Sequence, residues 1–175
     1  AVTVLSSDDL DKKQISTFVD ISAIAPGVNV AKNEGFKTVI TIRGVGYETN
    51  QNAIATPSVS YHLDGIYIAS PYSLQTEFMD LERIEVLRGP QGTLFGQNST
   101  GGAINVITAS PSLEESSSYG DITVGDYSLI KTRVSFNRPL SETLAVRASF
   151  ITHKRDGFTD NLSTGQDLDD ADSIS

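Results

Sequence analysis

The chain has 175 residues, and its 22 acidic and 13 basic side chains give a formal net charge of −9. This balance argues against a protein that tracks nucleic-acid phosphates, and no apolar run approaches the ~20 residues of a transmembrane helix. The absence of cysteine excludes disulfide scaffolds and thiolate zinc sites. The length predicts one domain or slightly more.

The first thirty residues predict a short strand followed by two capped helices. Ser7 and its acidic neighbours predict a first helix that runs to Lys13. Thr17 and Asp20 form a short-acid relative of the capping box and predict a second helix that stops at Pro26. Because no initiator methionine or signal peptide precedes the strand, we expect the native N-terminus to lie further upstream.

Strands separated by polar loops are expected next, because β-branched and aromatic residues become frequent. The candidate strands are residues 28–30, 39–42, 59–63 and 66–68. Asp64-Gly65, between the last two, is the sequence of a type I′ hairpin turn. Polar residues fill two loops, 32–37 and 47–57, and loops of this kind are often functional or mobile.

Residues 80–108, DLERIEVLRGPQGTLFGQNSTGGAINVIT, are the most informative stretch. Alternation around Ile84 and again around Ile104 predicts two strands joined by an irregular, glycine-rich corner. Regular alternation would place Glu82 on the face of Ile84, and Arg83 on the opposite face. The corner is not a phosphate-binding loop, because no Gly-Lys-Ser/Thr sequence follows its glycines.

Sites for covalent chemistry are not indicated. His62 and His153 lie far apart on predicted strands, without a second histidine or a cysteine at metal-ligand spacing, so a structural role is the safer interpretation. No Gly-x-Ser-x-Gly motif is present, which leaves a hydrolase unsupported. We therefore expect neither an enzyme nor a cofactor.

The pattern changes at Ser110-Pro111, after which the chain predicts an antiparallel meander over residues 121–124, 128–136 and 144–153. One face of each strand is apolar and the other polar, which fits either a lipid-facing barrel wall or a water-facing sheet packed on a core. The tail, 156–175, holds six aspartates and no basic residue, which predicts a solvated loop. Its spacing lacks the glycine turn and terminal glutamate of an EF-hand calcium loop.

The segment ERIEVLRGP, followed by LFG and GGAINVIT, resembles the plug-domain hallmark of TonB-dependent outer-membrane receptors. Residues 42–44 resemble the internal IRG of that family, residues 63–67 its DGV-type hairpin and residues 5–10 its opening strand and helix. The resemblance implies an α+β plug domain, a small mixed sheet with short helices, over residues 1–112. Residues 113–175 would then be the first antiparallel strands of an incomplete 22-stranded transmembrane β-barrel.

The resemblance also implies a function, that of an outer-membrane active transport receptor that TonB energises and that imports a scarce ligand, most often a ferric siderophore. The implied partners are TonB, reached through a segment upstream of this chain, the ligand and the outer membrane, with the receptor a monomer. Three strands cannot close a barrel, so we expect the chain to be a fragment. The alternatives are a free-standing soluble β-rich ligand- or protein-binding domain and, within the family, a vitamin or carbohydrate importer.

Two groups of site residues follow from the family fold. The loops that would face outward supply the predicted ligand-binding residues: Lys32, Asn33, Glu34, Tyr47, Glu48, Asn50, Gln51, Tyr72 and Ser73. Ion pairs between plug and barrel wall are predicted for Arg43, Glu82, Arg83, Glu85 and Arg88, with an exposed polar strand face as the alternative interpretation. No residue is predicted to bind a metal.

Overall fold

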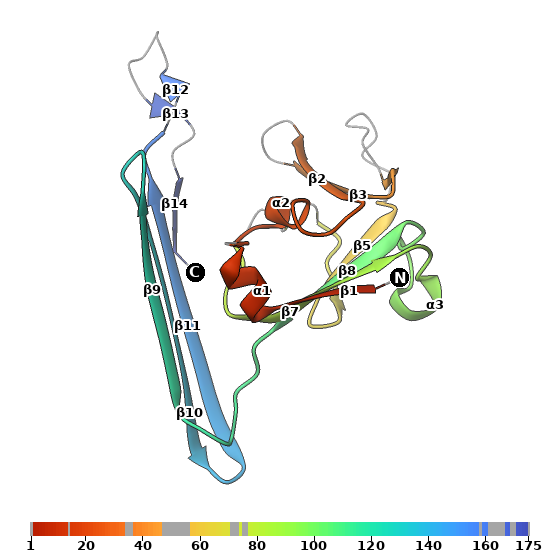
Figure 1. Cartoon of the computed structure of the whole chain (residues 1–175). Helices are drawn as coiled ribbons and strands as arrows, with labels where there is room; N and C mark the ends of the chain where they lie inside the picture. Colours follow the sequence, from red (N-terminus) through yellow and green to blue (C-terminus); the bar gives the residue numbers. More distant parts are fainter. Residues whose placement is uncertain are drawn as a thin grey trace. The chain divides into compact units, whose positions relative to one another are not determined.

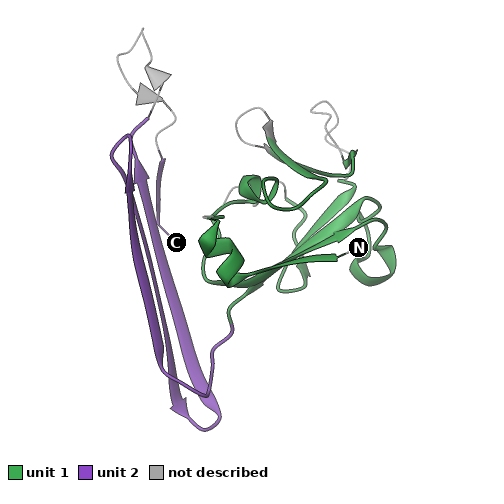
Figure 2. Ribbon diagram, in the orientation of Figure 1, with its two compact units in different colours: residues 1–109 green, residues 110–175 purple. Residues whose placement is uncertain are grey.

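The computed structural model describes residues 2–13, 15–33, 37–46, 57–70, 74, 77–157, 159–160, 167–168 and 171–174. The chain divides into two compact units, residues 1–109 and 110–175, each with its own sheets (Figure 2). The division falls next to Ser110-Pro111, where the sequence changes from mixed helix and strand patterns to plain alternation.

Unit 1 is built on a five-stranded mixed sheet in the order β1-β7-β8-β5-β6 (Figure 1). Its strands are β1 (Val2–Ser6), β5 (Val59–Leu63), β6 (Ile66–Tyr67), β7 (Leu81–Arg88) and β8 (Gly102–Thr108). β7 pairs antiparallel with both β1 and β8, whereas β5 pairs parallel with β8. The parallel pair joins segments that are far apart in the sequence.

A second, three-stranded sheet and three short helices complete unit 1. They are β2 (Val28–Asn33), β3 (Lys37–Ile42), β4 (Val45–Gly46), α1 (Ser7–Lys12), α2 (Phe18–Ile21) and α3 (Gly92–Phe95). One apolar core includes residues of α1, α2 and both sheets, with Phe18, Ile42 and Ile84 fully buried in it. Among the described residues, no helix is long and apolar enough to cross a membrane.

A capping box sets the start of α1, one residue earlier than the sequence predicts. The Ser6 hydroxyl accepts a hydrogen bond from the Asp9 N–H at 3.3 Å, and the Asp9 carboxylate accepts one from the Ser6 N–H at 3.1 Å. The box needs an acid three residues after the cap. Asp9 meets this requirement for Ser6, whereas the residue three after Ser7 is the buried Leu10.

Two local predictions for unit 1 are confirmed. Thr17 and Asp20 form a capping box at the start of α2, although the helix ends at Ile21 and only turns follow it before Pro26. Asp64 and Gly65 both have positive φ, 50° and 79°, between the paired residues of β5 and β6. Positive φ at both central residues is the requirement of a type I′ turn.

Gly102 begins β8 where its backbone passes very close to β7. Its φ is +151°, and a Cβ at this position would lie 2.3 Å from the Leu87 carbonyl oxygen and 2.8 Å from Ile42 Cδ1. Neither the conformation nor the space admits a side chain. At the other end of the corner, Gly89 has a φ of +87° and donates its N–H to the Gly101 carbonyl at 3.0 Å. The glycine-rich corner predicts positive φ or close backbone approach at Gly89, Gly101 and Gly102; this is confirmed for all three, since a Cβ on Gly101 would lie 2.9 Å from Val45 Cγ1.

Unit 2 is a four-stranded antiparallel sheet in the order β14-β11-β10-β9, with a separate β12-β13 pair (Figure 1). Its strands are β9 (Ser117–Gly125), β10 (Leu129–Ser141), β11 (Leu144–Arg155), β12 (Thr159–Asp160), β13 (Asp167–Leu168) and β14 (Ala171–Ile174). The predicted three-stranded meander is confirmed, and each of its strands is longer than the alternation alone indicates.

Two expectations for unit 2 are wrong. The sequence predicts a short proline-containing turn over residues 137–143, between two strands of the meander, but β10 continues through Pro139 to Ser141 with an irregularity in its pairing with β11. β9 begins at Ser117, opposite Asn137, so Pro139 lies where β10 has only one partner strand, as the missing N–H of proline requires. The acidic tail is not only a loop either, since residues 171–174 pair with β11.

One face of the unit 2 sheet is apolar and exposed. In the observed registers this face carries Ile122, Val124, Ile130, Val134, Phe136, Leu144, Val146, Phe150 and Ile174. Phe136 and Phe150 are 56% and 48% exposed, whereas Arg133 and Arg147 lie on the opposite face. A continuous apolar surface of this kind marks a contact with a membrane or a partner.

We predict that Gly102→Ala destabilises unit 1 by about 2 kcal/mol or more, because the new Cβ would overlap the Leu87 carbonyl at a positive φ. Urea unfolding followed by circular dichroism measures the loss. Gly92→Ala is the matched control, since a Cβ there meets nothing within 4 Å, and its effect should stay within about 0.5 kcal/mol. Equal stability of the two variants would contradict the close approach.

Candidate functional site

Most of the predicted ligand-binding residues lie outside the described part of the chain; these are Glu34, Tyr47, Glu48, Asn50, Gln51, Tyr72 and Ser73. Lys32 and Asn33 are the last two residues of β2 and pair with Thr38 and Lys37 of β3. The loop expected over residues 32–37 is therefore partly strand, because the two β-strands pair almost to the hairpin tip. The ligand-binding role of all nine residues stays a prediction.

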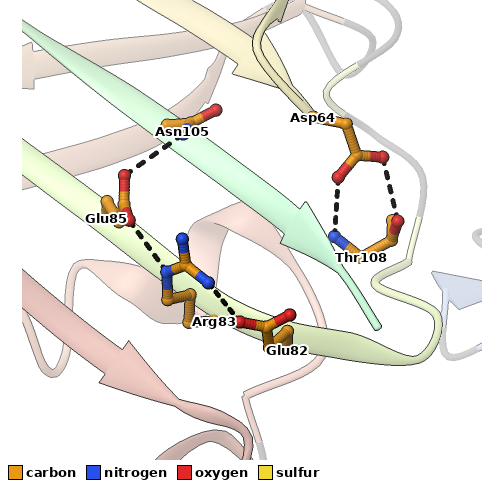
Figure 3. Close-up of polar contacts among 6 residues, drawn as sticks. All are labelled: Asp64, Glu82, Arg83, Glu85, Asn105 and Thr108. Carbon is orange, nitrogen blue, oxygen red and sulfur yellow. Dashed lines mark hydrogen bonds and ion pairs between the residues drawn. The ribbon is translucent and has the colours of Figure 1, made fainter. Parts of the chain in front are cut away.

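The charged residues of β7 form a continuous polar chain on unit 1 (Figure 3). Arg83 Nε donates to Glu85 Oε1 at 2.8 Å, and Arg83 Nη1 donates to the Glu82 carboxylate. The other oxygen of Glu85, Oε2, accepts from Asn105 Nδ2 of β8 at 3.2 Å. Four side chains from two neighbouring strands are thus linked by hydrogen bonds.

A β-bulge explains why Glu82 meets Arg83. Adjacent residues of a regular strand point to opposite faces of the sheet, so alternation alone separates these two side chains. The pairing of β7 with β8 shifts between Leu81 and Arg83, which makes Glu82 the extra residue. A bulge redirects side chains locally. Here it lets the Glu82 carboxylate reach Arg83, although the sequence pattern predicts the two side chains on opposite faces of the sheet.

The hydrogen bond between Arg83 and Glu85 favours the ionised form of both side chains. The Arg83 hydrogen bond is the main reason that the pKa of Glu85 lies below its usual value, burial opposes the shift, and Asn105 adds to it. In return, the hydrogen bond to Glu85 raises the pKa of Arg83. Because the side chains of Arg83 and Glu85 remain about a third and a quarter exposed, solvent screens the pair and it contributes little to stability.

The other two predicted ion-pair residues contact backbone atoms near Pro26. Arg88 Nε donates to the Pro26 carbonyl at 3.0 Å, which ties the end of β7 to the chain between α2 and β2. Arg43 follows β3 with a φ of +53°, and its N–H donates to the Gly27 carbonyl at 2.6 Å. Ion pairs from Arg43, Glu82, Arg83, Glu85 or Arg88 to a barrel wall stay a prediction.

A second polar contact fixes the end of β8. The Asp64 carboxylate accepts hydrogen bonds from the Thr108 N–H at 2.8 Å and from the Thr108 hydroxyl at 2.9 Å (Figure 3). The hairpin turn between β5 and β6 is thereby attached to the last residue of β8. In the described part of the chain, no three His, Asp or Glu side chains are grouped so that they could hold a metal ion.

His62 is a buried polar residue that motif reasoning could not place. It is 4% exposed on β5, beside Asn105 in register, and its ring lies 4.8 Å from that of Phe95 and 5.6 Å from that of Tyr67. Neither ring nitrogen has a hydrogen-bond partner, and the buried Ser60 hydroxyl on the same face also lacks one. Burial lowers the pKa of His62, and the Gly65 backbone opposes part of this effect.

The sequence could not signal this environment, because the ring of Phe95 comes from α3, in a segment whose pattern predicts only an irregular corner.

The geometry of the site as a whole is that of a domain held by hydrogen bonds at its strand ends and on one sheet face. Residues 1–103 match the family model of the TonB-dependent receptor plug domain.

The chain belongs to the TonB-dependent receptor plug-domain family. Its relatives include the pesticin receptor of Yersinia pestis, 32% identical over 171 residues that cover 94% of this chain and 24% of the relative. The vitamin B12 transporter BtuB of Vibrio vulnificus is 28% identical over 127 residues, covering 67% of this chain and 19% of the relative. The chain therefore spans about a quarter or less of the length of these curated relatives.

The fold is also that of solved receptors. The crystal structure of the ferric yersiniabactin uptake receptor FyuA from Yersinia pestis superposes with a TM-score of 0.78 at 27% identity, covering 99% of this chain and 27% of that chain. The similarity extends past the plug into the antiparallel strands that follow it. The predicted fold class, a plug with a mixed sheet and short helices followed by antiparallel strands, is confirmed. The family consists of transport receptors.

We predict that unit 1 loses stability on acidification through His62. Its pKa in the folded chain lies below the usual 6.5, so below that pH the unfolded chain binds the proton more strongly than the folded chain does. The contribution is therefore intact above pH 6.5 and is lost as the pH falls toward the folded pKa. Thermal unfolding at pH 7.5 and 5.5 measures it.

His62→Leu should reduce the difference between the two unfolding midpoints, because it removes the buried titratable ring. His153→Gln, which replaces the chain's other histidine, is the control and should leave most of the difference in place. A parent chain whose midpoint is the same at both pH values would contradict the prediction.

Proposed function

We propose that this chain forms the plug and the first barrel strands of an outer-membrane receptor that imports a ferric siderophore with energy supplied through TonB. The observation that carries the proposal is the combination of the plug-family match over residues 1–103 with the likeness to a ferric yersiniabactin uptake receptor over 99% of the chain. In this proposal the plug and its loops bind the ligand on their outer face, and the plug then rearranges to let it pass.

The proposed domain limits are residues 1–112 for the plug and 113–175 for the barrel strands, which would belong to a 22-stranded wall. A strand that crosses a bilayer at the usual tilt needs about 9–11 residues. β9, β10 and β11 have 9, 13 and 12 residues and present one exposed apolar face. The length of these strands and the exposure of their apolar face support a lipid-facing wall over a water-facing sheet, which would bury that face on a core.

In the proposed mechanism the ligand binds the outward loops and TonB then pulls on a segment upstream of β1. The contacts that hold unit 1 suit this cycle. The Arg83–Glu85 pair and the Arg88–Pro26 hydrogen bond are partly solvated, so they can break without leaving a charge buried and unpaired. The buried apolar core would resist the pull more strongly than these contacts, because its burial is lost only when strands separate.

A vitamin importer is the second candidate, because the similarity to BtuB covers 67% of the chain. The siderophore proposal has the broader support, since the likeness to the ferric yersiniabactin receptor covers nearly the whole chain. Binding of a ferric siderophore panel and of vitamin B12 to the receptor distinguishes the two candidates directly.

We predict that Lys32→Ala, Tyr47→Ala and Tyr72→Ala weaken ligand binding by the receptor without lowering its amount in the outer membrane. Surface substitutions away from the core usually change stability by only about 0.5 kcal/mol, so a loss of affinity would report on contact with the ligand. Titration of the receptor with ferric siderophores measures affinity, and growth on the same iron source measures uptake.

Ser118→Ala, on β9 rather than on a plug loop, is the control and should bind as the parent does. Unchanged affinity in Lys32→Ala, Tyr47→Ala and Tyr72→Ala alike would remove the proposed binding surface. Uptake that persists in cells without TonB would contradict the proposed energy source.

A further inference from the structure

Asn137 is the only fully buried polar side chain that the described part of unit 2 contains, at 3% exposed. Its Oδ1 accepts a hydrogen bond from the Ser112 N–H at 2.8 Å. Its Nδ2 donates to the Ser112 carbonyl at 3.0 Å and to the Glu115 carbonyl at 2.7 Å. One side chain on β10 therefore holds the backbone of the connector, residues 110–116, at two points.

The orientation of the Asn137 amide follows from this network. A carbonyl oxygen cannot donate to the Ser112 and Glu115 carbonyls, so the nitrogen must be the atom that faces them. The side chain satisfies three backbone groups of an otherwise irregular segment, and no other residue type of this size offers one acceptor and two donors in that geometry. The arrangement is specific to asparagine.

The connector is short between its two fixed ends. The Ala109 N–H donates to the Asp80 carbonyl at 2.8 Å, and the next anchored backbone group is the Ser112 N–H, held by Asn137. Only two residues, Ser110 and Pro111, separate these anchors. Without the Asn137 contacts, the unanchored stretch would extend to residue 116, and the five added residues would lengthen it by about 17 Å when extended.

We propose that Asn137 is a positioning residue that clamps the connector to β10 and so supplies the fixed end against which the plug is rearranged. This inference rests on the proposed function. A pull from the N-terminal side remodels the plug only if the other end of the plug is held. Slack in the connector lets the plug move as a whole before tension reaches its strands, and uptake then falls while ligand binding does not.

The first test measures the clamp itself by proteolysis of the folded receptor. The connector contains Glu114 and Glu115, both exposed, which a glutamate-specific protease cleaves when the segment opens. In Asn137→Ala and Asn137→Asp, cleavage after these residues should be about tenfold faster or more, because the bonds that favour the closed form are lost. Asn137→Asp should open at least as readily, since its carboxylate faces two carbonyls.

Ser135→Ala is the matched control, two residues earlier on the same face of β10, and it should cleave at the parent's rate. Equal cleavage of the parent and both Asn137 variants would overturn the clamp. This arm needs no ligand and no TonB, so it tests the clamp even if the receptor proves to import something other than a ferric siderophore.

The second test adds slack without touching Asn137. Six glycine and serine residues inserted between Ser110 and Pro111 lie before the clamp and should lower TonB-dependent uptake several-fold, as Asn137→Ala does. The same insertion between Ser116 and Ser117 lies beyond the clamp and should leave uptake unchanged. Ligand affinity and the amount of receptor in the membrane should match the parent in every variant.

The pair of insertions keeps the proposal testable if the Asn137 variants fail to fold. Equal uptake by the two insertion variants would overturn the positioning role, whether both are active or both are inactive. Faster cleavage in Asn137→Ala together with normal uptake would also overturn the positioning role, because losing the clamp would then have no effect on uptake. Lower uptake with the upstream insertion alone supports the proposal.

Discussion

The antiparallel pairing of β7 with β8 is the interaction on which the rest of unit 1 depends. One face of the pair supplies Ile84, Val86, Ile104 and Val106, all fully buried, to the apolar core. β1 adds to the outer edge of β7, and β5 adds in parallel to β8. Both neighbouring strands therefore take their alignment from the β7–β8 pair. Gly102 has no room for a side chain because β8 passes so close to the Leu87 carbonyl of β7.

The opposite face of the same sheet carries the partly solvated polar chain of Arg83, Glu85 and Asn105 beside the buried Leu87 and Ala103, and this asymmetry suits the proposed rearrangement of the plug. Core burial stabilises unit 1 internally. The Glu82–Arg83–Glu85–Asn105 chain and the Arg88 contact to Pro26 lie toward solvent, where each contributes little to stability and can be exchanged for water. In the proposed mechanism, rearrangement would begin at the polar contacts before any core side chain is exposed.

Local sequence rules account for much of the chain. The capping pair Thr17 and Asp20, the turn at Asp64-Gly65 and the alternation in β9 to β11 all depend on residues close together in sequence, and the structure confirms each of them. The family hallmark in residues 80–108 also identified the plug fold directly. In unit 2 the alternation indicated which side chains share a face, because successive side chains of a strand point to opposite faces of the sheet.

Contacts between distant segments are what the sequence alone could not determine. The parallel β5–β8 pair, the bulge at Glu82 and the return of residues 171–174 to β11 all depend on where another strand lies. The same is true of the burial of His62 under Phe95 and of the bonds from Asn137 to the connector. Each is a tertiary contact, whose partner lies beyond the few residues over which propensity and periodicity act, so only the folded chain decides it.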